Sequence, residues 1–386
     1  MEFVTVEGRT LKHALAPAID TVDRRYRIPI LGYVRLSHSA AGLQLMATDL
    51  DNWVSTSVDP IDGACEWQVC LDAKALDGIA RVAGVSSVRI EKLPEPPHDP
   101  NSKERRAMHS VRVSIDADDA VYELPYLPAD DFPEPPFQAA DRIETFTNGM
   151  LGSVVDKVRF CVSSEETRYY LNGVCWRRGP DGSSVVATDG HRLARCIYSS
   201  EASAESSRII PRKTIGVICK HMVGADVRVF EATDKKCALV FEAPGLRLSS
   251  KLIDGTFPDI DRVIPKGHVF EFTVQRADLV SALQKTTAMG RLERGRAIKF
   301  DHVDGRIAVE LKRPDFGSAR VKTAAAWPDP VDGVLASPFG FNGRYLLDIL
   351  AGCDGEVALR SKGAGDPFLI SDADTTMTRV LMPMRV

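Results

Sequence analysis

The run Val186-Ala187-Thr188-Asp189-Gly190-His191-Arg192-Leu193-Ala194 is the most distinctive stretch of this chain. An apolar segment leads into Asp189-Gly190, which is a turn signal, and Asp189 can cap that turn through the backbone. The pattern predicts a strand that ends in a tight turn. A weaker version, Met46-Ala47-Thr48-Asp49-Leu50-Asp51, stands earlier in the chain and indicates an internal repeat.

Three segments of similar organisation follow one another along the chain. Each opens with a short β-type run, at residues 3–6, 143–146 and 270–274. A helical pattern follows each run, because apolar residues recur at spacings of three and four. These patterns cover residues 11–22, 151–158 and 279–283.

A second helical pattern recurs later in each segment, at residues 76–83, 215–222 and 346–350. Glycines follow the three patterns at Gly84, Gly224 and Gly352, where a left-handed helix stop is expected. These glycines are 140 and 128 residues apart, close to a third of the 386-residue chain. The repeat predicts three α+β domains, each with two helices and several strands. The expected domains are residues 1–139, 140–266 and 267–386.

The overall composition is typical of a folded soluble protein, with 44% hydrophobic and 26% charged residues. The formal net charge of −4 argues against a simple basic protein that coats nucleic acid. It leaves open a protein that concentrates its cations on one face. No apolar run approaches the ~18 residues of a membrane helix, and no secretory pattern opens the chain. We therefore expect a cytoplasmic protein without a membrane segment.

The patterns of metal and cofactor sites are missing from the sequence. No pair among the eight cysteines is spaced as C-x-x-C, and no H-E-x-x-H, P-loop or G-x-G-x-x-G string occurs. We expect no cofactor and no metal, and we expect the cysteines to be reduced core residues. Asp189 and His191 could form an acid/base pair, but residues two apart in a turn seldom aim at one substrate, and no nucleophile stands beside them.

The string at residues 187–194 resembles the signature of the bacterial DNA sliding clamp, the beta subunit of DNA polymerase III. Further phrases resemble that family in the same order along the chain: IPILG (28–32), RYYLNG (168–173), IPRK (210–213), KLIDG (251–255), FPD (257–259), GFN (340–342), YLLD (345–348) and MPMRV (382–386). The resemblance covers essentially the whole chain. It implies a non-catalytic head-to-tail homodimer, in which six domains form a ring around duplex DNA with helices lining the hole and strands on the outer rim.

The resemblance also implies cations that contact DNA without reading its sequence, since sliding requires phosphate contacts without base readout. Arg25 has the strongest case, because the family places a DNA-contacting arginine just ahead of the phrase at residues 28–32. The expected DNA-binding residues are Arg25, Arg24, Arg27, Lys12, Lys74, Arg81, Arg212, Lys213 and Lys220.

A peptide groove is the second site that the resemblance implies. The DNA polymerase III alpha subunit, the clamp-loader delta subunit and other clamp-binding polymerases and repair proteins would insert a short motif there. Apolar anchors with a few orienting polar groups suit such a site. The groove residues by matching strings are Leu171, Thr188, Gly190, His191, Arg192, Leu193, Pro258, Arg262, Val263, Asn342, Tyr345, Val380, Leu381, Met382, Pro383 and Met384.

Four features depart from the family's pattern. Ile260-Asp261 replaces a common Tyr-Arg pair, and Glu165 stands where a polar uncharged residue often faces DNA. Residues 92–110 contain four prolines and predict an unusually long surface loop. A basic cluster lies at Arg291, Arg294 and Arg296. These departures indicate a divergent clamp.

Three hypotheses remain open at this point. The first is a sliding clamp, which predicts no turnover and a loss of peptide binding when the last five residues are removed. The second is a hydrolase built on repeated α+β domains, which predicts that activity is lost when Asp189 or His191 is replaced. The third is a clamp-like scaffold that no longer encircles DNA, for which charge reversal at Arg25 leaves polymerase stimulation unchanged.

Overall fold

A computed structural model describes most of the chain. The described residues are 1–23, 25, 27–94, 109–116, 119–180, 182–200, 202, 204–233, 238–288, 297–313, 317–326 and 338–386. They form two compact units. Unit 1 comprises Met1–Gly152 and Gly216–Leu252, and unit 2 comprises Ser153–Ile215 and Ile253–Val386. Both units combine helices with antiparallel sheets, which confirms the α+β class.

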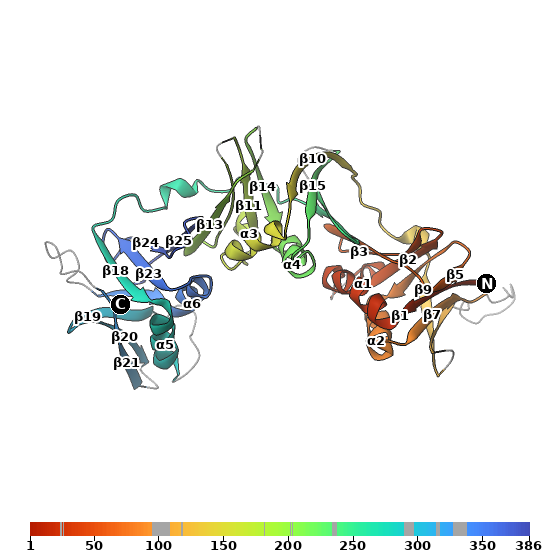
Figure 1. The fold of residues 1–386 in the computed structure, drawn as a ribbon, viewed down its shortest axis with the longest axis horizontal. Coiled ribbons are helices and arrows are strands. Elements are labelled where there is room, and N and C mark those ends of the chain that lie inside the picture. The colour runs from red at the N-terminus through yellow and green to blue at the C-terminus, as the bar shows by residue number, and fades with distance from the viewer. Residues whose placement is uncertain are drawn as a thin grey trace. The chain divides into compact units, whose positions relative to one another are not determined.

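Unit 1 is built on an antiparallel sheet. In sheet order its strands are β10 (Ala139–Phe146), β15 (Val227–Ala232), β16 (Ala238–Ala243), β17 (Leu246–Lys251), β4 (Asn52–Val58), β3 (Gly42–Thr48), β2 (Tyr33–Ser39), β6 (Trp67–Asp72), β9 (Ala120–Leu127), β8 (Ser110–Ile115), β7 (Ser87–Lys92), β1 (Glu2–Glu7) and β5 (Asp62–Ala64). Helices α1 (Gly8–Thr21) and α2 (Ala73–Ala83) pack against each other, and α1 also packs on β3 and β4 (Figure 1). The 3₁₀ turns η1 (Pro29–Gly32) and η2 (Ala129–Asp131) connect these elements.

Unit 2 contains two antiparallel sheets among its described residues. The first runs β14 (Ser206–Pro211), β11 (Gly173–Arg178), β12 (Ser183–Thr188), β13 (Arg192–Tyr198), β25 (Met377–Leu381), β24 (Phe368–Ser371), β23 (Glu356–Ser361) and β18 (Phe270–Gln275). The second runs β21 (Gly317–Ala324), β20 (Arg306–Arg313), β19 (Ala297–Val303) and β22 (Phe339–Asn342). Helices α5 (Arg276–Thr287) and α6 (Gly343–Ala351) pack together, and η3 (Tyr169–Leu171) and η4 (Ile260–Arg262) are short turns. Two of the three unit boundaries fall within α3 (Met150–Arg159) and α4 (Arg212–His221), and the third follows β17.

Alternating burial explains why the sheets and helices pack as they do. In β2, Val34 and Leu36 are fully buried while their neighbours are half-buried, which gives the strand one core face. In α1, Leu11, Leu15 and Ala18 lie on one side and join that same core. Each of the Val and Leu side chains contributes ~1.5–3 kcal/mol when it leaves water. The apolar spacing read from the sequence therefore fixes which face of each element turns inward.

The ends of the second helices are set by caps and glycines. The Asp72 carboxylate accepts from Ala75 N at the start of α2, at 2.8 Å. Gly84 and Gly224 have φ of +58° and +70°, as expected for residues that end a helix. The same expectation is wrong for Gly352, whose φ is −99°. Its amide bonds back into α6, so the helix ends without a left-handed residue at that position.

The internal repeat of the sequence has a counterpart in the strand pairing. In unit 1, β4 pairs with β17 so that Trp53 faces Ser249. In unit 2, β13 pairs with β25 so that Leu193 faces Val380. Trp53 and Leu193 stand at the same place after the repeated Thr-Asp motif. The Trp53–Ser249 pair in unit 1 therefore occupies the position of the Leu193–Val380 pair in unit 2, although the side chains differ.

The described cysteines are free thiols, and five of them are buried: Cys70, Cys161, Cys175, Cys196 and Cys353. Burial raises the pKa of Cys70 to about 12 and that of Cys353 to about 11. Cys65 is exposed, which contradicts the expectation of a core residue. In the described ranges no three metal-binding side chains cluster, and no helix has the length and apolarity to cross a membrane. Cys237, Arg291, Arg294, Arg296 and most of the 92–110 loop lie outside the described residues.

Candidate functional site

The distinctive turn is held by its own aspartate. β12 ends at Thr188 and β13 begins at Arg192. The Asp189 Oδ1 accepts hydrogen bonds from His191 N at 2.9 Å and from Arg192 N at 3.0 Å. Gly190 has a φ of +86°, a conformation that residues with a Cβ rarely adopt. The motif is therefore a tight, capped connection that fixes the side chains on either side of it.

Arg192 links this turn to α6. It donates to Asp189 Oδ2 at 3.0 Å and to Asp348 Oδ2 at 2.6 Å, and its guanidinium lies 4.3 Å from the centre of the Tyr345 ring. The side chain is only 10% exposed. Burial opposes its charge, but the hydrogen bonds to the two carboxylates raise the pKa of Arg192 above its usual value. Arg192 is thus a fixed, charged wall of the site.

His191 and Asp189 are engaged separately. The His191 ring stacks on Tyr345, with ring centres 6.2 Å apart. The Asp189 carboxylate bonds to main-chain amides and to Arg192. The aspartate therefore orients the backbone and the arginine rather than the imidazole, and the two side chains do not form the acid/base pair considered above.

A cavity of about 260 Å³ opens beside this turn, within unit 2. Ten of the sixteen expected groove residues line it: Leu171, Thr188, Gly190, His191, Arg192, Leu193, Pro258, Val263, Val380 and Met382. The pairing of β13 with β25 brings Leu193 and Val380 together, and the Met382 amide bonds to His191 O at 2.8 Å. Leu171, Leu193 and Val380 are also nearly buried, so core packing holds the apolar floor in place.

The other six expected residues do not line the cavity: Arg262, Asn342, Tyr345, Leu381, Pro383 and Met384. Leu381 points to the opposite side of β25 and is fully buried in the core. Asn342 caps α6 through Arg344 N and Tyr345 N. The amide of Met384 bonds to Gly340 O at 2.8 Å, which fastens the C-terminal tail. Leu381, Asn342 and Met384 therefore support the site from behind, whereas the Arg262 side chain is exposed and pairs with Asp259 Oδ2 at 3.0 Å.

The sequence interpretation missed four residues that line the cavity: Arg168, Tyr170, Asp259 and Ile260. Arg168 and Tyr170 belong to the RYYLNG phrase and could have been carried over with it. Ile260 was noted only as a departure, yet it is 1% exposed and packs against Leu171 and Val380 in one cluster. A buried contact of this kind has no signal in a single sequence.

Glu165 is explained by its partner. Arg168 donates to Glu165 Oε2 from Nε at 2.9 Å and from Nη2 at 2.7 Å, and it also donates to Asp189 O at 3.3 Å. A Cβ on Gly190 would lie 2.5 Å from Arg168 Nη1. Glu165 thus holds an arginine across the mouth of the cavity, directly against Gly190.

The expected DNA-binding cations differ in how far their charge is already balanced. Lys220 Nζ lies 2.6 Å from Asp20 Oδ2, which also contacts His221 Nε2 at 2.7 Å, and Arg81 pairs with Asp77. Asp20 is partly desolvated, yet the hydrogen bonds from Lys220 and His221 hold its pKa below the usual value. Five others are exposed and make no ion pair with a described residue: Lys12, Arg25, Arg27, Lys74 and Arg212. Lys213 is half-buried in α4, and Arg24 lies outside the described residues.

The chain was compared with known protein families and structures. Residues 145–259 match the DNA polymerase III beta subunit, central domain, and residues 261–385 match the C-terminal domain of that subunit. The beta sliding clamp of Caulobacter vibrioides (strain NA1000 / CB15N) is 33% identical, over 99% of this chain and 100% of its own. The beta sliding clamp of Bacillus subtilis (strain 168) is 24% identical over 99% of both chains.

Solved structures agree with these relatives in fold. The beta subunit of DNA polymerase III from Pseudomonas aeruginosa gives a TM-score of 0.86 at 24% identity, with both chains fully covered. The sliding clamp of Bartonella birtlesii, solved bound to griselimycin, gives a TM-score of 0.85 at 30% identity, again over both full chains. The chain therefore belongs to the beta sliding clamp family, the beta subunits of bacterial DNA polymerase III.

Proposed function

We propose that two copies of this chain close head to tail into a ring around duplex DNA and tether the replicative polymerase to it. In this proposal the protein is a non-catalytic processivity factor that acts in the bacterial cytoplasm. Each copy contributes three clamp domains, residues 1–139, 140–266 and 267–386. The family assignment supports this role, and the repeat in strand pairing supports it physically.

The observation that carries the ring is a pair of open strand edges. β4 and β13 each pair with the last strand of the following segment, β17 and β25. β21 follows β19 and β20 as β4 follows β2 and β3, yet among the described residues it pairs only with β20. Open edges invite pairing with another chain.

The matching edge belongs to β9. It closes the first segment as β17 and β25 close the others, and residues 120–125 pair only with β8 in the described chain. We propose that β9 of one copy pairs with β21 of the other. Two such junctions close a ring, because two copies related by a half-turn pair both of their open edges with each other.

The cavity beside Gly190 is the proposed docking site for a short motif of partner proteins. Its apolar floor of Leu171, Leu193 and Val380 suits aliphatic or aromatic anchors, and Arg168 and His191 can orient a peptide at the rim. Met382 is 37% exposed and adaptable, which suits several partners. We propose the alpha subunit of DNA polymerase III, the delta subunit of the clamp loader, and other clamp-binding polymerases and repair proteins as those partners.

The five exposed cations Lys12, Arg25, Arg27, Lys74 and Arg212 are the proposed phosphate contacts, with Arg24, Arg81, Lys213 and Lys220 in supporting roles. Contacts to phosphate oxygens hold DNA without reading its sequence, so they permit sliding. Their attraction weakens as salt is added, because counterions compete for the phosphates.

Topological linkage to DNA tests the ring. The protein is loaded by a clamp loader onto a nicked circular plasmid and then passed through a sizing column, before and after the plasmid is cut once. We expect retention on the circle and release from the linear form. Equal release from both forms would rule out encirclement.

A truncation tests the groove separately. Removing Met382–Val386 leaves β25 intact, since that strand ends at Leu381. We expect the truncated chain to lose binding of a fluorescent peptide that carries the polymerase motif. A truncated chain that binds this peptide normally would contradict the groove assignment but would not bear on the proposed ring.

A further inference from the structure

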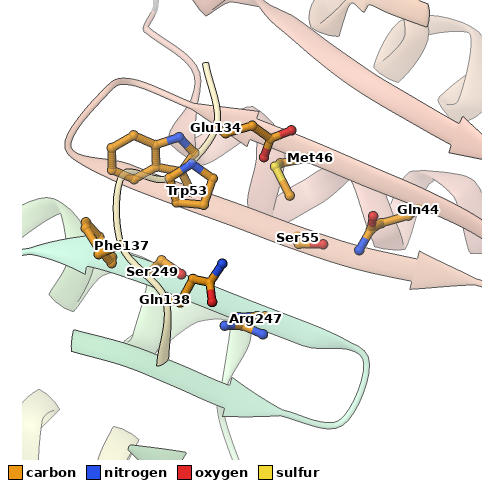
Figure 2. Close-up of a pocket in the computed structure, with 10 residues that line it drawn as sticks. Gln44, Met46, Trp53, Ser55, Glu134, Phe137, Gln138, Arg247 and Ser249 are labelled. Carbon is orange, nitrogen blue, oxygen red and sulfur yellow. The ribbon is translucent and has the colours of Figure 1, made fainter. Parts of the chain in front are cut away.

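A second cavity lies in unit 1, beside the weaker repeat motif, whose first residue, Met46, lines it. Its volume is about 350 Å³, within the range of ~300–1,000 Å³ that is typical of ligand sites. Figure 2 shows that its side chains come from β3, β4 and β17 and from the segment after η2. They are Gln44, Met46, Trp53, Ser55, Glu134, Pro135, Phe137, Gln138, Arg247 and Ser249.

Strand alternation explains how these residues reach one face. Met46, Ser55 and Arg247 are direct cross-strand neighbours on β3, β4 and β17. Trp53 and Ser249 form the next row. The residues between them, such as Leu45 and Val54, turn to the opposite face and are buried there. The cavity therefore sits on the face of the sheet that α1 does not cover.

The wall of the cavity is firmly held. Trp53 donates its indole N–H to Pro133 O at 2.9 Å, and the Phe137 ring meets the Trp53 ring edge-on with centres 5.7 Å apart. Arg35 bonds to Glu134 and also reaches Met46 Sδ at 3.4 Å. These contacts fasten the segment after η2 over the sheet, so the cavity is pre-formed.

Four polar side chains in this cavity have no hydrogen-bond partner among the described residues. Within the described part of the chain, none of Gln44, Ser55, Gln138 and Ser249 forms a side-chain hydrogen bond. Ser249 is only 5% exposed, so its hydroxyl opens mainly to the cavity. Two amides and two hydroxyls can together donate and accept several bonds. This arrangement suits a ligand with a row of amide groups, such as an extended peptide.

The charges around the cavity leave one positive charge in excess. Arg247 lies 3.4 Å from Glu242, and Arg228 lies 3.2 Å from that same carboxylate. Two arginines thus share one acid, while Glu134 is balanced by Arg35. Arg247 is 47% exposed and lines the cavity. A carboxylate on the ligand would balance the second arginine charge.

The cavity is also the counterpart of the groove in unit 2. Trp53 and Ser249 stand where Leu193 and Val380 form the floor of that groove. The apolar pair of the groove is replaced here by an aromatic ring and a hydroxyl. The two cavities therefore share a backbone plan but select different ligands.

We propose that this cavity docks an extended peptide segment of a partner protein that carries a carboxylate side chain. Arg247 receives the carboxylate, Gln44 and Gln138 bond to the peptide main chain, and Met46 with the aromatic pair receives the neighbouring apolar side chain. The site is separate from the proposed groove and does not depend on it.

Methionine methyl signals test the proposal in the full-length protein. With ¹³C-methyl methionine, Met46 reports on this cavity and Met382 reports on the groove. The probes are the blocked tripeptide Ac-Leu-Asp-Leu-NH₂, its neutral twin Ac-Leu-Asn-Leu-NH₂, and inorganic phosphate. We expect the acidic peptide to shift Met46 saturably, and the neutral twin to bind about fivefold more weakly, as for one exposed charge pair.

Variants separate the charge from the fold. Arg247→Ala should weaken the acidic peptide about fivefold and abolish its preference over the neutral twin, while Arg247→Lys should keep most of the affinity. Arg228→Ala is the matched control, because it shares Glu242 but does not line the cavity. Its binding should stay unchanged.

Three results would overturn the proposal. One is no shift of Met46 at millimolar peptide, and a second is equal binding of the two tripeptides. The third is a shift by phosphate as strong as by the acidic peptide, which would mark a simple anion site. A shift of Met382 alone, produced by the polymerase motif peptide, would support the groove. It would count against the second site only together with the first result above, in which the acidic tripeptide leaves Met46 unmoved.

Discussion

Arg192 Nη1 lies 2.6 Å from Asp348 Oδ2, which ties the first residue of β13 to helix α6. The arginine is 10% exposed and the aspartate 37% exposed. Tyr345 of the same helix contacts the Arg192 guanidinium, which lies 4.3 Å from the ring centre, and stacks with the His191 ring. Helix α6 therefore positions the polar wall of the groove although Asp348 itself does not line the cavity.

We expect the two residues of this ion pair to contribute unequally to the free energy of unfolding. Arg192→Ala should destabilise the protein by about 2–3 kcal/mol, because two carboxylates lose their partner in a partly buried place. Asp348→Ala should cost about 1 kcal/mol, since water screens that end and Asp189 still holds the arginine. Denaturant unfolding measures both values. Equal costs for the two variants would show that Asp348 carries more of the link than its exposure allows.

A glycine pair tests how tightly the groove is built. Gly190→Ala should weaken binding of the polymerase motif peptide by about tenfold, because the new methyl would collide with Arg168 and force a strained backbone, at a cost of ~1–2 kcal/mol. Gly216→Ala is the control, since nothing lies within 4 Å of its Cβ and it sits inside α4. Fluorescence polarisation compares the two.

The control should bind normally and be slightly stabilised, because alanine favours a helix over glycine by ~0.5–1 kcal/mol. If Gly190→Ala binds the peptide as well as Gly216→Ala does, Arg168 is not held against Gly190 in solution.

Acid should selectively weaken the contact between Lys157 and Asp374. The hydrogen bonds from Lys157 Nζ, at 2.7 Å, and from Thr376 lower the pKa of Asp374 to about 2. A carboxylate with a depressed folded pKa stabilises the protein above its unfolded pKa of ~3.9, and this contribution is lost as the pH falls toward about 2. Asp374→Asn should therefore be less stable than the parent at pH 6, and most of this deficit should disappear as the pH falls to 2.

Lys157→Ala removes the partner instead of the acid and should follow the same pH profile. Unfolding midpoints at several pH values provide the comparison. A deficit of Asp374→Asn that persists unchanged at pH 2 would mean that packing, rather than charge, explains the loss.

The exposed cations can be ranked by their partners. Arg25→Glu should reduce stimulation of DNA synthesis and flatten its salt dependence, because an unpaired phosphate contact is reversed. Lys220→Ala should have a smaller effect than Arg212→Ala, since Asp20 already balances Lys220. Primer extension at two salt concentrations tests the order. Unchanged stimulation with Arg25→Glu would favour a scaffold that does not encircle DNA.

Local spacing was enough to place the helices. The apolar patterns marked α1 to α4 and α6 because each helix turns one apolar face to a core. The pattern at α5 faded after Leu283, yet the helix continues to Thr287. Thr286 is fully buried on the same face as Ala282 and Leu283, and its hydroxyl donates to the Ala282 carbonyl. The buried face therefore continues through a polar residue, which the apolar pattern does not show.

The groove was predictable only in part. Matching strings led to ten of the fourteen residues that line the cavity, but the contact between Leu193 and Val380 comes from strand pairing across the chain. The balance of Lys220 by Asp20 depends on residues far apart in sequence. The cavity around Trp53 includes Met46 of the weaker repeat motif, but its other lining residues come from separate segments, so only the fold reveals it.

Electron microscopy of the purified protein tests the central claim most directly. Two 42.3-kDa chains should appear as a closed ring of six lobes around a hole wide enough for duplex DNA. A three-lobed particle that remains open at concentrations well above those used for DNA synthesis would contradict the proposed closure through β9 and β21.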